Sequence, residues 1–421
     1  MELGFINFNT EEKQKVYKVL QIVRESQAID ELGIGRIRDV FSNTLFPGMS
    51  TLQHHAKYFA VLPSLYYQLT KESFHNVREV RKRIIDLEIK LTRKFVEASK
   101  LYKDSDPFGI TGSGVLEAAE RDSNKYVKYD PTYIYYNGLV TYNIIKSRGN
   151  LYNLILEQSH KYNENPSRMK GRTNMDDSAD ANEFTGEKQL FATCGEVYNF
   201  SSSIPLSLDL TYKEAKFIKD HIEESPDSKE SLLAYLLKND IPLNVNGENE
   251  CLIDYEYLLT IWKDYDIPLK LLHPYILSVR FSKFVDLLRI RYKYLYDSRT
   301  EQTDSADEMK ELFYDVWQQE RADLSNDKIQ EIIDYCMNTV HENTVLKFCK
   351  EAAILINQES WDELDLLIEN REIQVKSRER SKLYNFHRYK NMEFSLQRRL
   401  TYRWELVNKV INEIRKGIGY E

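Results

Sequence analysis

The order of hydrophobic and polar residues along the chain predicts a protein built mainly of helices. In residues 9–28, Val16, Leu20 and Val23 recur at the spacing of one helix face. Similar patterns predict helices over residues 51–70, 73–102, 275–297, 308–320, 327–355 and 403–416. Strand patterns are few, and the clearest are YIYY at 133–136 and EVYNF at 196–200. We therefore expect a mainly α fold (α+β with few short strands) whose helices form two to three packed domains.

One helix start is marked by side-chain chemistry as well as by periodicity. Thr211 is followed three residues later by Glu214, the spacing of a capping box. We therefore expect a helix to begin directly after Thr211.

Polar stretches set the expected domain limits within the 421 residues. The segment 163–188 is the least core-like and is interpreted as a flexible linker or loop. It separates an N-terminal helical domain, 1–162, from a mostly helical middle domain, 189–300. A second polar stretch at 298–308 precedes a C-terminal helical domain, 301–421.

The stretch DELGIGRIRDVFSNTLFPGMSTLQHHAKYF, which starts at Asp30, contains two closely spaced glycines and a Phe-Pro-Gly break. GIGRIR is only half of a dinucleotide-binding fingerprint, because Arg38 stands where its third glycine should be. We expect Gly33 and Gly35 to turn the chain into a helix that ends at Leu45. The Pro-Gly pair then stops that helix, and Ser50 or Thr51 caps the next one.

This arrangement of helix, tight turn and helix resembles a helix-turn-helix unit. Its candidate nucleic-acid-binding residues are Arg36, Arg38 and Lys57. The alternative is an ordinary helical hairpin whose basic side chains are solvated. His54 and His55 are adjacent, so they point to different sides of a helix and are poor candidates for joint metal binding.

Charge is distributed unevenly along the chain. The net charge is −8, yet residues 371–404 carry ten Lys or Arg against three Glu; this +7 leaves −15 for the remainder. Aromatic residues are interleaved with these basic residues, and the two kinds could act together on a nucleic acid, because basic groups neutralise phosphates and aromatic faces can stack on exposed bases. The alternative is that the aromatics are core and the bases are solvated or bind acidic groups. The candidate nucleic-acid-binding residues are Arg378, Arg380, Lys382, Arg388, Lys390, Arg398, Arg399 and Arg403.

Composition excludes several classes of protein. No apolar run approaches the roughly 20 residues of a membrane-spanning helix. The cysteines (Cys194, Cys251, Cys336 and Cys349) are scattered without a CxxC pair, which favours reduced thiols and disfavours zinc. We expect a cytoplasmic protein with no cofactor, no metal and no membrane partner.

Two patterns raise the alternative of a metal-dependent nuclease of restriction type. Such a site needs an acid followed by Glu/Gln-x-Lys to hold a metal and activate water. Asp209 precedes Glu214-x-Lys216, but the capping box puts these last two on a helix. Asp365, Gln374 and Lys376 form the other set, which requires IQVK at 373–376 to be a strand.

The ordered set of LGFINF, the DELGIG-x-IRD…FPG-x-ST block, GITGSG, YIYYNGL and LTYRW resembles an uncharacterised bacterial family of unknown function. The resemblance extends over nearly the whole chain. It implies a role in antiviral defence, because members are often encoded beside helicases, methylases and nucleases in defence islands. The family brings no established catalytic residues.

Together these observations favour a non-catalytic subunit of an antiviral defence system over an enzyme. Its expected partners are DNA or RNA and other subunits, such as a helicase or ATPase, a nuclease or a methylase. A metal-dependent nuclease is the alternative.

Overall fold

The computed structural model describes most of the chain. The described residues are 31–101, 108–164, 190–200, 202–243, 255–337, 339–340, 343–390, 396 and 399–419. They are mainly helical, and no strand or sheet forms among them. An isolated antiparallel bridge joins Ile145 to Phe191. The helix expected at 9–28 lies outside the described residues.

The chain folds into two compact units, each assembled from segments that are distant in sequence. Unit 1 combines residues 1–45 with 244–402, and unit 2 combines residues 46–243 with 403–421. The sequence had suggested contiguous domains at 1–162, 189–300 and 301–421, whereas both units are discontinuous. Residues 165–189, most of the expected linker, are outside the described part of the chain.

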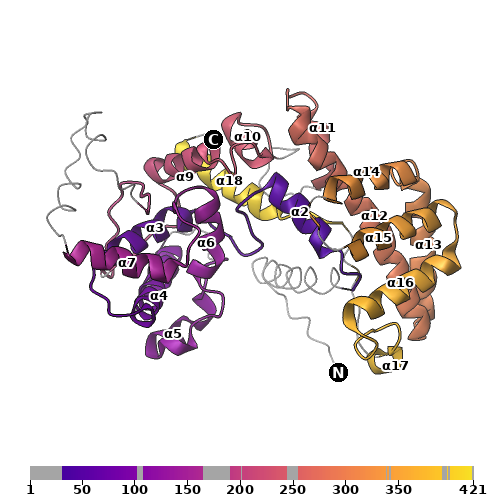
Figure 1. Ribbon diagram of the computed structural model, residues 1–421, viewed down its shortest axis with the longest axis horizontal. Helices are drawn as coiled ribbons and strands as arrows, with labels where there is room; N and C mark the ends of the chain where they lie inside the picture. The colour runs from indigo at the N-terminus through magenta and orange to yellow at the C-terminus, as the bar shows by residue number, and fades with distance from the viewer. Residues whose placement is uncertain are drawn as a thin grey trace, which may run out of the picture. The chain divides into compact units, whose positions relative to one another are not determined.

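Unit 1 is organised around α12 (Leu269–Arg299), a helix of 31 residues that is buried on almost every side. Helices α13, α14 and α16 pack against α12, and α15 lies against α14 and α16 (Figure 1). From the N-terminal segment, α2 also contacts α12, and Phe41 stacks on Tyr335. The other described helices of unit 1 are α2 (Gly35–Leu45), η4 (Tyr255–Tyr257), α11 (Leu258–Trp262), α13 (Thr303–Glu320), α14 (Asn326–Met337), α15 (Asn343–Asn357), α16 (Trp361–Lys376) and α17 (Phe386–Tyr389).

Unit 2 is built around α3 (Lys57–Leu69), which packs against α4, α6, α7 and α9. The rings of Tyr58 and Tyr135 stack within this core at 4.7 Å between centroids. The other described helices of unit 2 are α4 (Val77–Leu101), η1 (Ser113–Val115), α5 (Leu116–Arg121), η2 (Ser123–Lys125), α6 (Pro131–Thr141), α7 (Leu151–Glu164), α9 (Tyr212–Glu224), α10 (Leu232–Lys238) and α18 (Trp404–Ile418).

The C-terminal helix α18 completes unit 2 by packing on α9 and α10. Trp404, Val407, Ile411 and Ile414 are among the residues that form its buried stripe. These positions recur at helical spacing, which explains why the sequence predicted this element at 403–416.

Several predicted elements are confirmed and others are wrong. The capping box is present, because the Thr211 hydroxyl accepts from the Glu214 N–H and the Glu214 carboxylate accepts from the Thr211 N–H. The single helix expected at 327–355 is instead two helices, α14 and α15.

Both expected strands are wrong. Residues 133–136 lie in α6, because Asp130 caps that helix by accepting the Tyr133 N–H at 2.7 Å and Pro131 occupies its first position. These start signals outweigh the strand preference of tyrosine and isoleucine. Residues 196–200 are irregular backbone.

Two of the glycines identified in the sequence, Gly33 and Gly48, allow backbone turns that other residues would strain. Gly33 and Gly48 have φ of +62° and +79°, a region that glycine enters without strain. A Cβ on Gly48 would lie 2.8 Å from the Tyr142 ring, so this turn also needs the absence of a side chain. Gly35, by contrast, is simply the first residue of α2.

Candidate nucleic-acid interface

The basic residues at 36, 38 and 57 do not form a helix-turn-helix surface. Helix α2 ends at Leu45, and α3 begins only at Lys57, after the irregular residues 46–56 rather than a tight turn. The expected cap at Ser50 or Thr51 is therefore wrong. The two helices also belong to different compact units.

Each of these three bases has an interaction within the protein. Lys57 is buried, and its Nζ lies 2.6 Å from the Glu214 carboxylate. Arg38 pairs with its neighbour Asp39 at 2.7 Å, and the exposed Arg36 also has a polar or ring partner. Lys57 is thus part of the core and cannot reach a phosphate.

The strand required by the nuclease alternative is absent. Asp365, Gln374 and Lys376 all lie on α16. Asp365 and Gln374 are nine residues apart, which puts them on opposite faces of a helix. The Asp365 carboxylate binds the Arg291 guanidinium at 2.6 and 2.8 Å, so its oxygens already have a cation.

The other candidate nuclease set, Asp209 with Glu214 and Lys216, also lacks the required strand. Glu214 and Lys216 are on α9, where Glu214 is buried with Lys57, and Lys216 is exposed and pairs with Asp220 at 3.0 Å. Across the described ranges, no three His, Cys, Asp or Glu side chains form a set that could hold a metal ion.

The basic segment 371–404 divides into residues that hold unit 1 together and residues that face solvent. The first group centres on Glu31, which is 2% exposed. Lys382 contacts one Glu31 oxygen at 2.8 Å, and Lys376 contacts the other. Burial alone would raise the pKa of Glu31, but the hydrogen bonds and charges of these two lysines outweigh it and lower that pKa.

A second buried carboxylate, Glu372, fixes the turn that follows α16. Its oxygens accept from the Ser381 hydroxyl at 2.7 Å and from the backbone N–H groups of Lys382 and Leu383 at 2.8 and 3.0 Å. The Tyr292 hydroxyl donates to the same carboxylate at 2.8 Å. The backbone that leads into the exposed part of the segment is therefore held by buried hydrogen bonds.

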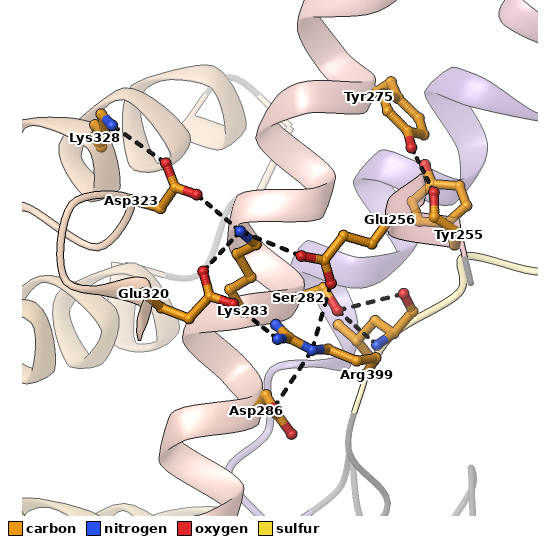
Figure 2. A network of polar contacts seen from close by, with 11 residues as sticks. Tyr255, Glu256, Tyr275, Ser282, Lys283, Asp286, Glu320, Asp323, Lys328 and Arg399 are labelled. Carbon is orange, nitrogen blue, oxygen red and sulfur yellow. Dashed lines mark hydrogen bonds and ion pairs between the residues drawn. The ribbon is translucent and has the colours of Figure 1, made fainter. Parts of the chain in front are cut away.

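Arg399 is also structural. Figure 2 shows its guanidinium and the Lys283 ammonium sharing acidic partners in unit 1. Lys283 contacts Asp323 at 2.8 Å, and Arg399 reaches Glu320 at 2.9 Å. Asp286, which Arg399 faces at 3.5 Å, is completely buried. Arg399 therefore balances charges inside the protein.

The remaining members of the segment have mixed environments. Arg403 lies in unit 2, has φ of +70°, and donates to the carbonyl of Met49 at 2.5 Å. Lys390 is exposed and pairs with the exposed Glu301. Arg398 lies outside the described residues.

Three arginines from the predicted set are left on the surface with no carboxylate partner in the described part of the chain: Arg378, Arg380 and Arg388. Arg380 donates from Nε to the Lys376 carbonyl at 2.9 Å, which orients its guanidinium. The Arg378 guanidinium lies over the ring of Tyr384, 4.8 Å from the centroid, and this tyrosine is 45% exposed. We call these three arginines and Tyr384 the Arg378 surface.

The Arg378 surface combines the two properties that single-strand binding requires. Guanidinium groups neutralise phosphates, and an exposed ring offers a face on which a base can stack. Sequence reasoning identified the three arginines but missed Glu31 and Glu372, which position the segment. Glu31 is distant in sequence from the segment, and no local pattern marks either carboxylate as buried.

Comparison with known proteins adds one finding. Residues 1–158 match a family described as a family of unknown function (DUF6361). The resemblance seen in the sequence is thus supported for an uncharacterised family, over a shorter stretch than expected. No curated protein and no solved structure matches the chain. No helix in the described part of the chain is long and apolar enough to cross a membrane.

Proposed function

We propose that this protein is a non-catalytic, nucleic-acid-binding subunit of a bacterial antiviral defence system. The observation that carries the binding is the Arg378 surface, where Arg378 lies over the exposed ring of Tyr384 and the exposed Arg380 and Arg388 have no carboxylate partner among the described residues. The other described bases of the segment already have protein partners, so the arginines left at the surface suit a ligand from solution. The defence role rests on the resemblance of the sequence motifs.

The preferred ligand is a single strand of DNA or RNA. In a duplex the base faces are covered by neighbouring bases, so Tyr384 could not stack on them. In a single strand each base presents a face, and stacking on an aromatic ring contributes about 1–3 kcal/mol. Helicase or nuclease partners of a defence complex would supply such strands.

A charge-reversal variant tests this proposal. In Arg378→Glu/Arg380→Glu/Arg388→Glu, we expect the affinity for a labelled single strand at low salt to fall about tenfold or more, because phosphate contacts are lost. Fluorescence anisotropy measures the affinity, and circular dichroism checks the fold.

A matched control separates the local surface from net charge. Lys310→Glu/Lys347→Glu/Lys350→Glu changes the net charge equally at exposed positions on α13 and α15. When the same comparison is made at about 0.15 M salt, we expect its affinity to stay within about threefold of the wild-type value, since charges farther apart than roughly 8 Å are largely screened there. An equal loss in both variants, or no binding by the wild-type protein, would overturn the proposal.

A further inference from the structure

A second exposed aromatic and basic cluster lies in unit 2, at the start of α6. Tyr129 and Tyr133 are 45% and 64% exposed, and their ring centroids are 5.0 Å apart with a tilt of 37°. The Lys128 ammonium lies over the Tyr129 ring, 5.2 Å from its centroid. Both rings therefore offer exposed surface beside each other.

The backbone under these rings is held by buried groups. Asp130 accepts the Tyr133 N–H at 2.7 Å, and the fully buried Glu88 accepts the Thr132 N–H at 2.7 Å. The hydroxyls of Tyr66 and Thr132 are hydrogen-bonded at 2.9 Å. Because the first turn of α6 is fixed in this way, the backbone that carries Tyr133 is held in place, which lowers the entropy cost of binding.

Three basic side chains in this part of unit 2 are exposed. Lys125, Lys128 and Arg81 are exposed, and Arg81 has no ion-pair partner among the described residues. Burial raises the pKa of Asp130, while the charge of Arg81 acts to lower it, which puts Arg81 within electrostatic reach of this turn. Asp130 is only 8% exposed and is engaged with the helix N-terminus, so it contributes little negative surface.

We propose that Lys128, Tyr129 and Tyr133 form a stacking site for an unpaired base of a single-stranded nucleic acid, with Arg81 and Lys128 contacting the flanking phosphates. The site deepens the proposed function and rests on it for the class of ligand. A membrane surface fits less well, because it would require a wider apolar patch than two tyrosine rings flanked by bases. Tyr133 is the more exposed ring and offers the larger stacking face.

The test compares two strands with equal numbers of phosphates. One is a labelled oligothymidine, and the other is the same strand with abasic sites in place of its bases. We expect the wild-type protein to bind the strand with bases more tightly. In Tyr129→Ala/Tyr133→Ala this preference should fall about tenfold, because the stacking energy is lost while the phosphates remain.

Two control variants keep the result interpretable. Tyr133→Phe keeps an aromatic face and should keep the preference. Tyr212→Ala removes a tyrosine of similar exposure, 59%, elsewhere in unit 2 and should change nothing. An unchanged preference in Tyr129→Ala/Tyr133→Ala, or the same loss in Tyr212→Ala, would overturn the inference.

The same assay distinguishes this inference from the proposed function. The triple arginine variant of the Arg378 surface should weaken binding of both strands while leaving much of the preference due to Tyr129 and Tyr133. If the triple variant binds like the wild type while the double tyrosine variant loses its preference, the role of the Arg378 surface fails and the stacking site stands. If the wild-type protein binds neither strand at low salt, both are wrong.

Discussion

At the residue scale, several charged side chains belong to the core. Lys57 and Glu214 have side chains only 3% and 1% exposed, and the Lys57 ammonium also donates to the Asp209 carbonyl at 2.9 Å. Glu214 further accepts from the Tyr198 hydroxyl. Each charge in this pair is compensated by the other and by hydrogen bonds, which is the condition for burying it.

Removing one partner of this buried ion pair should lower the stability of the fold. We expect Lys57→Met to lower the free energy of unfolding of unit 2 by about 3–5 kcal/mol, because it leaves the Glu214 carboxylate buried without its cation. Denaturant unfolding followed by circular dichroism measures this. Lys57→Met/Glu214→Gln should regain part of the loss, and a single variant as stable as the wild type would show that the pair is not needed.

The buried Glu88 carboxyl predicts that the stability of the folded protein depends on pH. Burial first, and then the charge of Asp130, raise the pKa of Glu88 well above its ordinary 4.5. The folded state therefore favours the neutral carboxyl. Its contribution to stability is full below pH 4.5 and is lost as the pH rises through the folded-state pKa.

Glu88→Gln should remove this dependence, because an amide stays neutral and can still accept the Thr132 N–H. We expect the melting temperature of the variant minus that of the wild type to increase as the pH rises above 4.5. Thermal melts across a pH series measure the difference. A constant difference across the series would mean that Glu88 does not change its charge in this range.

At the element scale, the turn after α16 contains both basic residues that stabilise the fold and basic residues that are exposed. Lys382 binds the buried Glu31, whereas Arg378, four residues earlier, lies over the exposed Tyr384. Two bases in the same short segment therefore have different roles.

Charge reversal at these two positions should separate stability from binding. We expect Lys382→Glu to lower the free energy of unfolding of unit 1 by at least about 2 kcal/mol, because it places a carboxylate beside buried Glu31. Arg378→Glu is the matched control and should change stability by less than about 0.5 kcal/mol. Equal effects on the unfolding midpoint would contradict this division.

Local signals in the sequence were sufficient for some elements and misleading for others. The capping box fixed the start of α9, and helical periodicity located α4, α12 and α18. Helical periodicity missed the break between α14 and α15, and the strand-like pattern at 133–136 was misleading because these residues lie in α6. The first turn of α6 depends on Glu88, a carboxylate of another helix, so no short window of sequence contains it.

The candidate site was predictable only as a list of bases. Sequence identified the segment 371–404, and the Arg378 surface lies within it. Whether a given arginine faces solvent depends on carboxylates far away along the chain, as Glu31 shows for Lys382. The aromatic pair of Tyr129 and Tyr133 was missed because Tyr133 had been assigned to a strand at 133–136.

At the scale of the whole molecule, each compact unit takes residues from distant parts of the chain. Helix α18 belongs to unit 2, where the Arg415 guanidinium donates to the carbonyls of Leu236 and Ile241 at 2.8 and 2.9 Å. Unit 2 is therefore incomplete without α18.

Truncation tests this dependence. We expect a chain ending at Tyr402 to lose hydrogen-exchange protection throughout 46–243, because the faces of α9 and α10 that pack on α18 become exposed. Protection in α12–α16 of unit 1 should persist. A chain ending at Gly419 keeps α18 whole and is the control, and protection that is unchanged in the shorter chain would contradict the assignment.

The central claim, that the Arg378 surface contacts the phosphates of a single strand, is tested most directly by the salt dependence of binding. The logarithm of the affinity should fall linearly with the logarithm of the salt concentration, with a slope near −0.7 for each phosphate contacted. In Arg378→Gln/Arg380→Gln/Arg388→Gln, which removes charge without adding repulsion, the account predicts a slope shallower by about 2. A slope equal to that of the wild-type protein would contradict it.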